Sequence, residues 1–130
     1  ELTYTAEEDC LVQATRDEIH QVIYNLTDNA LKYSSKGTVF VNLKKNDGKV
    51  VLSVADQGPG IPEEDIERVF DRFFRVDKAR SRAAGGTGLG LSIVSDTVRR
   101  RGGTVWAKNR PEGGAVFTVC WTAVEGGETV

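Results

Sequence analysis

Three polar side chains, Asn25, Asn29 and Lys32, recur at intervals of four and three positions. In an α-helix this spacing places them on one narrow stripe. Mg²⁺ takes oxygen ligands and keeps several waters, so two amide oxygens one helical turn apart suit a hydrated ion. The ammonium group of Lys32 can reach a phosphate as a point charge. An ordinary amphipathic helix with surface amides has the same residues, so this stripe alone leaves both interpretations open.

A second group, Asp56, Gly58, Gly60, Ile61 and Pro62, directly follows a segment with alternating apolar residues. A carboxylate at the end of a strand can accept a hydrogen bond from the exocyclic amine of adenine. Glycines beside it remove the side chains that would block a flat ring. Tight turns use the same residue types, and taken alone this segment is better interpreted as a turn.

A third group, residues 85–91, reads Gly-Gly-Thr-Gly-Leu-Gly-Leu and opens a helical pattern. Successive glycines let backbone N–H groups converge on an anion, and a helix N-terminus adds positive partial charge. The Gly-Lys-Ser/Thr of a Walker loop does not follow, and the loop does not follow a buried strand as in a dinucleotide-binding fold. A flexible linker is the alternative. Linkers rarely lead straight into a well-patterned helix, so we favour a phosphate cradle.

Three phenylalanines, Phe70, Phe73 and Phe74, stand with Arg75 just before this glycine-rich loop. The segment 72–90 is basic and then rich in glycine. Aromatic residues that could anchor a segment to the body of the domain, followed by a basic stretch that ends in glycines, are typical of a mobile active-site lid. The alternative is a solvated run of charge over a small core helix.

These groups need a framework of strands and helices to position them. Hydrophobic alternation and turn residues predict strands near 2–5, 11–15, 38–43, 49–55, 104–108 and 115–122. Helices are expected over 17–33, 63–70 and 89–101, with Asp17 as the N-cap of the first and Gly102-Gly103 ending the last. Hairpin signals at 46–48 and 111–114 indicate mainly antiparallel pairing. The fold class is therefore α+β, with one mixed sheet and its helices on one face.

Length and composition fit one domain over residues 1–130. The net charge of −2 makes nucleic acid an unexpected partner. Two cysteines far apart suit a reducing compartment, and no apolar run is long enough to span a bilayer. Because the chain starts at Glu1 rather than methionine, we interpret it as a piece of a longer protein whose membrane anchor would lie elsewhere.

Taken together, the groups resemble the motifs of the catalytic domain of sensor histidine kinases, which belongs to the ATPases with the Bergerat fold. Residues 25–33 resemble the asparagine box, 56–62 the first glycine box, 70–75 the phenylalanine box, 86–91 the second glycine box and 113–119 the closing strand motif. The resemblance covers nearly the whole chain. Four boxes in a fixed order are highly specific, although any one would be weak. The lid, 77–84, matches no family pattern closely, and Arg101 stands where relatives often have histidine.

The resemblance implies a two-layer α/β sandwich, with about five strands on about three helices and ATP held between the helices and the lid. Asp56 would hold adenine, and Asn29, helped by Asn25, would ligate Mg²⁺. The implied catalytic residues are Asn25, Asn29, Lys32 and Arg75. The implied nucleotide-binding residues are Asn29, Lys32, Tyr33, Asp56, Gly58, Gly60, Ile61, Gly86, Thr87, Gly88, Leu89 and Gly90.

By the same resemblance, the terminal phosphate of ATP would pass to a histidine on a separate helical dimerisation domain, and from there to a response regulator. The only histidine of this chain, His20, lies away from the asparagine stripe, and we interpret it as a solvated surface residue. The parent protein is expected to be a membrane-anchored homodimer with this domain in the cytoplasm. The isolated domain is expected to be monomeric.

Two alternatives compete with a kinase. ATPases of the same fold that hydrolyse ATP place a glutamate one turn before the metal-binding asparagine, as a general base. That place is Asn25 here, and an amide cannot take a proton. A degenerate domain that only binds partners is the second alternative, which the intact Asn29, Asp56 and glycine loop disfavour.

Overall fold

The computed structural model describes residues 2–6, 10–33, 37–71, 90–124 and 128–130. The lid, 77–84, and the glycines of the loop at 85–89 lie outside these residues. Among the described residues, no helix is long and apolar enough to cross a membrane.

Five strands form the main sheet, in the order β1-β3-β4-β6-β5. They are β1 (Leu2–Ala6), β3 (Val39–Asn46), β4 (Lys49–Ala55), β6 (Ala115–Thr122) and β5 (Thr104–Asn109). Strand β1 runs parallel to β3, and every other pair is antiparallel. The predicted mixed, mostly antiparallel sheet is therefore confirmed.

A smaller two-stranded sheet pairs β2 (Leu11–Val12) with β7 (Glu128–Thr129). The strand predicted over 11–15 is thus shorter than expected, and the prediction missed β7. The strand cannot extend to Thr15, because Thr15 caps the following helix.

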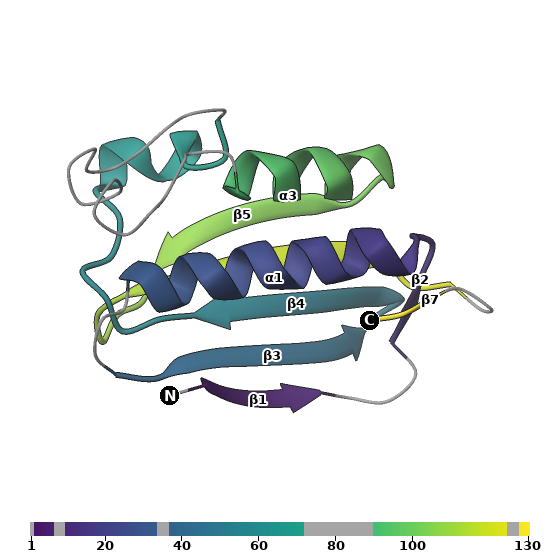
Figure 1. Cartoon of the computed structure of the whole chain (residues 1–130), viewed down its shortest axis with the longest axis horizontal. Helices are drawn as coiled ribbons and strands as arrows, with labels where there is room; N and C mark the ends of the chain where they lie inside the picture. Colours follow the sequence, from purple (N-terminus) through teal and green to yellow (C-terminus); the bar gives the residue numbers. More distant parts are fainter. Residues whose placement is uncertain (1, 7–9, 34–36, 72–89, 125–127) are drawn as a thin grey trace.

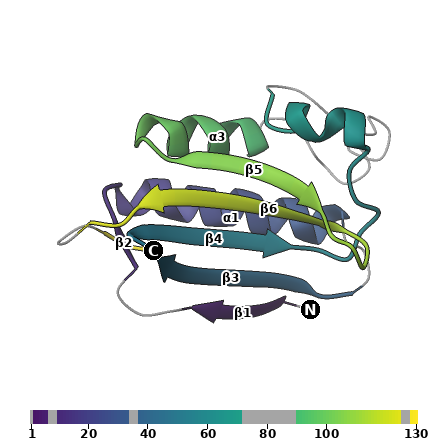
Figure 2. The ribbon, with the colours of Figure 1, turned by 180° about the vertical axis from the view of Figure 1, so that it is seen from behind.

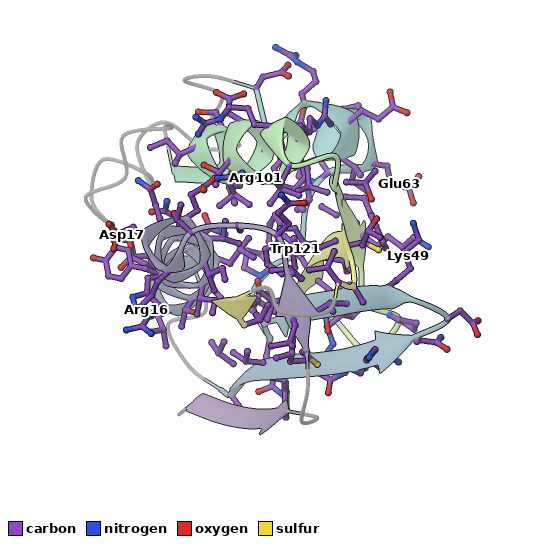
Figure 3. The ribbon with its side chains drawn as sticks, turned by 90° about the vertical axis from the view of Figure 1, so that its right-hand side faces the viewer. Arg16, Asp17, Lys49, Glu63, Arg101 and Trp121 are labelled. Atoms are coloured by element: carbon purple, nitrogen blue, oxygen red, sulfur yellow. The ribbon has the colours of Figure 1, made fainter. Side chains whose placement is uncertain are left out.

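Helices α1 (Arg16–Tyr33) and α3 (Gly90–Arg100) lie on one face of the main sheet, as Figures 1 and 2 show from its two sides. A short 3₁₀ helix, η1 (Glu63–Arg68), replaces the predicted helix over 63–70. Trp121 of β6 points between the helices and the sheet and is almost completely buried (Figure 3). The apolar stripes of both long helices pack there against the alternating valines and leucines of the strands, as their periodicity requires. The core contains Ile19, Val22, Leu26, Ala30, Val39, Leu43, Val50, Leu52, Val54, Val94, Val98, Val119 and Trp121.

Local hydrogen bonds explain where the two long helices begin and end. The N–H of Glu18 donates to Thr15 Oγ1, and the N–H of Thr15 donates to Glu18 Oε1, both at 3.1 Å. This is a capping box with Thr15 as the N-cap, so the prediction that Asp17 caps the helix was wrong. At the end of α3, Gly102 has φ +77° and the N–H of Gly103 donates to the carbonyl of Val98 at 3.0 Å. This Schellman arrangement confirms the predicted stop.

The capping glutamate also joins the two helices. Arg101, which follows α3, donates from Nε to Glu18 Oε2 at 3.2 Å and from Nη2 to Glu18 Oε1. Figure 3 shows Arg101 between α1 and α3. Hydrogen bonds from Arg101 and from the Thr15 N–H lower the pKa of Glu18 from 4.5 to about 2. The sequence alone does not predict this role of Arg101.

We expect Glu18→Gln to lower the free energy of unfolding by about 0.5–1 kcal/mol at pH 7, the usual value of a partly exposed ion pair. Glutamine still accepts a hydrogen bond from Thr15, so the variant removes mainly the charge. The pKa of Glu18 is lower in the folded protein, so this contribution is complete above about pH 4.5. It is lost as the pH falls towards 2.

Urea unfolding of wild type and variant from pH 7 to pH 2.5 measures this effect. Glu67→Gln, which neutralises an exposed carboxylate of η1, is the control. A difference at pH 2.5 as large as that at pH 7 would contradict the assignment.

Candidate functional site

The predicted site residues gather at one end of the molecule. The C-terminal end of β4, the C-terminal half of α1 and the N-terminus of α3 all lie at this end, on the left of Figure 1 and the right of Figure 2. The loop 56–62 leaves β4 here and leads to η1. The fold therefore brings together three of the segments that the sequence analysis singled out.

Asp56 is the most buried polar side chain of the loop, with 5% of its surface exposed. Its Oδ1 accepts hydrogen bonds from the N–H of Gly58 at 2.9 Å and from the N–H of Ala115 at 3.1 Å. No other described residue donates to its second oxygen, Oδ2. One carboxylate oxygen thus fixes the loop, while the other can accept a hydrogen bond from a ligand.

The far end of the loop is held by Asn109, the last residue of β5. Its Oδ1 accepts from the N–H of Ile61 and its Nδ2 donates to the carbonyl of Ile61, both at 2.7 Å. Gly60 has φ +81°, and a Cβ there would lie 2.9 Å from Asn109 Oδ1. Glycine at 60 is therefore required both by its backbone conformation and by the close approach of Asn109.

The near end of the loop is held by the turn 110–114, which joins β5 to β6. Arg110 Nη1 donates to the carbonyl of Asp56 at 2.7 Å, and its guanidinium lies over the ring of Phe40, 5.4 Å from the centroid. Gly114 has φ +89°, and a Cβ there would lie 2.8 Å from the carbonyl carbon of Asp56 and closer still to its oxygen. Only a residue without a side chain fits between the turn and the loop.

Sequence reasoning missed Asn109 and Arg110. It identified Gly114 only as part of the closing motif and gave it no role. The available signal was the run Asn-Arg-Pro-Glu-Gly-Gly, which predicts a turn. It does not predict that the turn contacts a loop about fifty positions earlier in the chain.

Asn25 and Asn29 lie on α1, both half-buried at the margin of its apolar face. A Cβ on Gly90, the first residue of α3, would lie 3.8 Å from Asn25 Oδ1. Neither amide forms a hydrogen bond with another described residue. Their oxygens are therefore free of described protein partners, and that of Asn25 lies next to the N-terminus of α3. Two such amide oxygens fit ligands to a phosphate-bound Mg²⁺.

Lys32 is on the same stripe, but its ammonium group forms an ion pair with Asp28, with 3.0 Å between Nζ and Oδ2. Both side chains are about one-third exposed, at 34% and 36%. A weak, solvated pair of this kind is easily exchanged for a phosphate. Tyr33 ends α1, and its side chain is not among those that the structure describes.

The remaining predicted residues fall into two groups. Arg75, Gly86, Thr87, Gly88 and Leu89 lie outside the described residues. Of the phenylalanine box, Phe70 is described, and its ring meets that of Phe117 edge to face at a centroid distance of 6.2 Å. This contact anchors Phe70, which follows η1, to the core. Phe73 and Phe74 lie outside the described residues, so the aromatic anchor of the lid stays a prediction.

His20 is exposed on α1. It is five positions from Asn25, which places it on the far side of the helix from the stripe. Among the described residues, no three or more His, Cys, Asp and Glu side chains cluster as a metal site.

Comparison with known proteins agrees with this geometry. Residues 14–125 match the model of the family described as histidine kinase-, DNA gyrase B-, and HSP90-like ATPases. The sensor histidine kinase WalK of Bacillus subtilis is 44% identical over 115 residues, covering 86% of this chain and 19% of WalK. The chain spans 19–28% of the length of the first curated relatives that it matches, all sensor or sensor-like histidine kinases.

Solved structures give the same result. The catalytic domain of histidine kinase ThkA superposes with a TM-score of 0.80 and 34% identity, covering 95% of this chain and 80% of that one. ThkA has also been solved in complex with the response regulator TrrA, with a TM-score of 0.77, 31% identity, and coverage of 95% and 34%. Full-length ShkA, solved with AMPPNP, has a TM-score of 0.78 and 29% identity, with coverage of 95% and 26%. The chain therefore belongs to the family of histidine kinase-, DNA gyrase B- and HSP90-like ATPases.

Proposed function

We propose that residues 1–130 form the ATP-binding catalytic domain of a sensor histidine kinase. The observation that carries the proposal is the state of Asp56. Its carboxylate is buried at the end of β4, one oxygen is fixed by two backbone N–H groups, and the other has no described donor. The exocyclic amine of adenine can donate to that second oxygen, whereas guanine presents a carbonyl oxygen at the matching position.

The polar stripe of α1 supplies the phosphate end of the site. Asn29, helped by Asn25, would ligate Mg²⁺ through its amide oxygen, and Lys32 would leave Asp28 for a phosphate oxygen. Bound Mg²⁺ would supply positive charge that offsets the negative charge developing on the phosphate oxygens during transfer. Gly90 and its preceding glycines, 86 and 88, would present backbone N–H groups at the start of α3. We further propose that Tyr33, Arg75, Thr87 and Leu89 complete this part of the site.

The residue one turn before Asn29 favours transfer over hydrolysis. A hydrolysing ATPase needs a general base to activate water. Asn25 occupies that position, and an amide accepts no proton at neutral pH. Transfer to histidine does not need this base, because an imidazole nitrogen attacks the terminal phosphorus itself. The new P–N bond forms as the bond to the bridging oxygen breaks and ADP takes its electron pair.

The acceptor would lie on a helical dimerisation domain of the parent protein, and a response regulator would take the phosphoryl group from it. The complex of ThkA with TrrA supports such a partner. We propose that the parent is a membrane-anchored homodimer and that this domain lies in the cytoplasm and is monomeric alone. His20 has no part in the reaction, because it faces away from the stripe.

Incubation with ATP labelled at the terminal phosphate tests this function. The chain alone, with Mg²⁺, should neither label itself nor release phosphate quickly. Addition of the dimerisation domain carrying the acceptor histidine should produce label on that domain. The Asn29→Ala variant should reduce this labelling by at least tenfold, because the metal loses its main protein ligand. Labelling at His20 would contradict an acceptor on a separate domain, and rapid phosphate release without the partner would instead indicate a hydrolysing ATPase.

A further inference from the structure

One segment far along the sequence, residues 109–114, holds the loop 56–62 in one conformation. The turn 110–114 and the residue before it contact the loop at both of its ends. At one end Arg110 and Gly114 meet the main chain of Asp56, and at the other Asn109 bonds both backbone groups of Ile61. Within the described residues, the loop's hydrogen bonds to this hairpin outnumber those inside the loop itself.

The contact to Ile61 is stronger than a single hydrogen bond. A side-chain amide that bonds the N–H and the C=O of one residue reproduces the pairing of a neighbouring strand. Both distances are 2.7 Å, and Ile61 is buried although Asn109 itself is exposed. One side chain thus satisfies both backbone groups of Ile61 at once. Loss of the amide would leave the N–H and the C=O of a buried residue without these partners.

The contact of Arg110 with the main chain of Asp56 also lies at the proposed adenine site. Arg110 is itself largely buried, with 16% of its side chain exposed, and Glu112 pairs with it at 2.9 Å. Its third contact, with Phe40, fixes the guanidinium plane. Arg110 thus holds the carbonyl of the residue whose carboxylate would recognise adenine.

We propose that Asn109 is a positioning residue of the nucleotide site, which keeps the loop 56–62 in the conformation that binds adenine before ATP arrives. The inference rests on the proposed function and adds a residue that does not touch the nucleotide. A loop fixed in advance avoids the ordering cost that a free loop would incur on binding. Asn109 therefore acts on ATP affinity and leaves the rate at saturating ATP unchanged.

The test compares Asn109→Ala with Lys108→Ala, which shortens the exposed neighbour of Asn109 on β5. Calorimetry with Mg-ATP at 15 °C should give a dissociation constant about tenfold higher for Asn109→Ala and unchanged for Lys108→Ala. Amide hydrogen exchange should become faster at Ile61 in Asn109→Ala but stay slow in β4 and β6. Labelling of the acceptor domain at saturating ATP should equal that of the wild type.

Three results would count against the proposal. Unchanged ATP affinity together with faster exchange at Ile61 would show that the two hydrogen bonds between Asn109 and Ile61 have no role in binding. Unchanged exchange at Ile61 would show that these hydrogen bonds are absent in solution. Faster exchange throughout the sheet would assign Asn109 to general stability. If the wild type itself bound no ATP, the proposed function would be wrong. That result is distinct from the three above, because each of those concerns only the Asn109→Ala variant.

Discussion

Replacement of Gly114 by alanine should lower the free energy of unfolding by about 2–5 kcal/mol and remove most of the affinity for ATP. Two costs add. A residue with a Cβ at φ +89° is strained by about 1–2 kcal/mol. The new methyl group would also overlap the main chain of Asp56, and overpacking of this kind costs about 1–3 kcal/mol. The backbone of Asp56 must move away, and its carboxylate moves with it.

Gly113→Ala is the matched control, because Gly113 has φ +105° but a Cβ there would have no heavy atom within 4 Å. It should show the strain alone, about 1–2 kcal/mol, with ATP affinity close to that of the wild type. Urea unfolding and Mg-ATP calorimetry on both variants measure the two effects. Equal stability and equal affinity of the two variants would mean that the close contact between the turn and the loop does not matter.

Asp56→Asn should weaken ATP binding roughly 5–150-fold, which corresponds to about 1–3 kcal/mol for an unsatisfied buried group. The variant keeps an Oδ1 that accepts from Gly58 and Ala115, so the loop should hold its shape. It replaces Oδ2 by an NH₂ group, which would face the exocyclic amine of adenine donor to donor. Because that NH₂ can donate to the carbonyl oxygen of guanine, the preference for ATP over GTP should narrow.

Asp47→Asn controls for the change of charge, since Asp47 lies in the β3–β4 turn at the opposite end of β4. Its affinity for ATP should equal that of the wild type. Calorimetric titration of both variants with ATP and GTP gives the four constants that are needed. Wild-type affinity of the Asp56→Asn variant for ATP would contradict the proposal that the Asp56 carboxylate recognises adenine.

Much of the fold could be predicted because its signals are local. The two-residue turn at Asp47 and Gly48 has positive φ at both positions, as the asparagine–aspartate–glycine run indicated. The boundaries of α3 and β6 followed from periodicity and from the paired glycines. The N-cap of α1 was misplaced because Asp17 and Thr15 are both good caps, and only the reciprocal bond with Glu18 selects Thr15.

Contacts between distant segments left no such signal. The partners Asn109 and Ile61 are 48 positions apart, and Arg110 and Asp56 are 54 apart. Hydrophobic periodicity reports which side of an element is buried, not which polar side chain meets which backbone group. The ion pair of Glu18 with Arg101 was not predicted for the same reason, since it forms only after α1 and α3 have packed together.

Calorimetric titration of the wild-type chain with Mg-ATP and with Mg-GTP tests the central claim most directly, because every role proposed for the loop 56–62 depends on adenine recognition. We expect one binding site, a clear preference for ATP over GTP, and a loss of affinity when EDTA removes the metal. Binding of neither nucleotide, or equal affinity for both, would contradict the assignment of Asp56 and with it the account of this site.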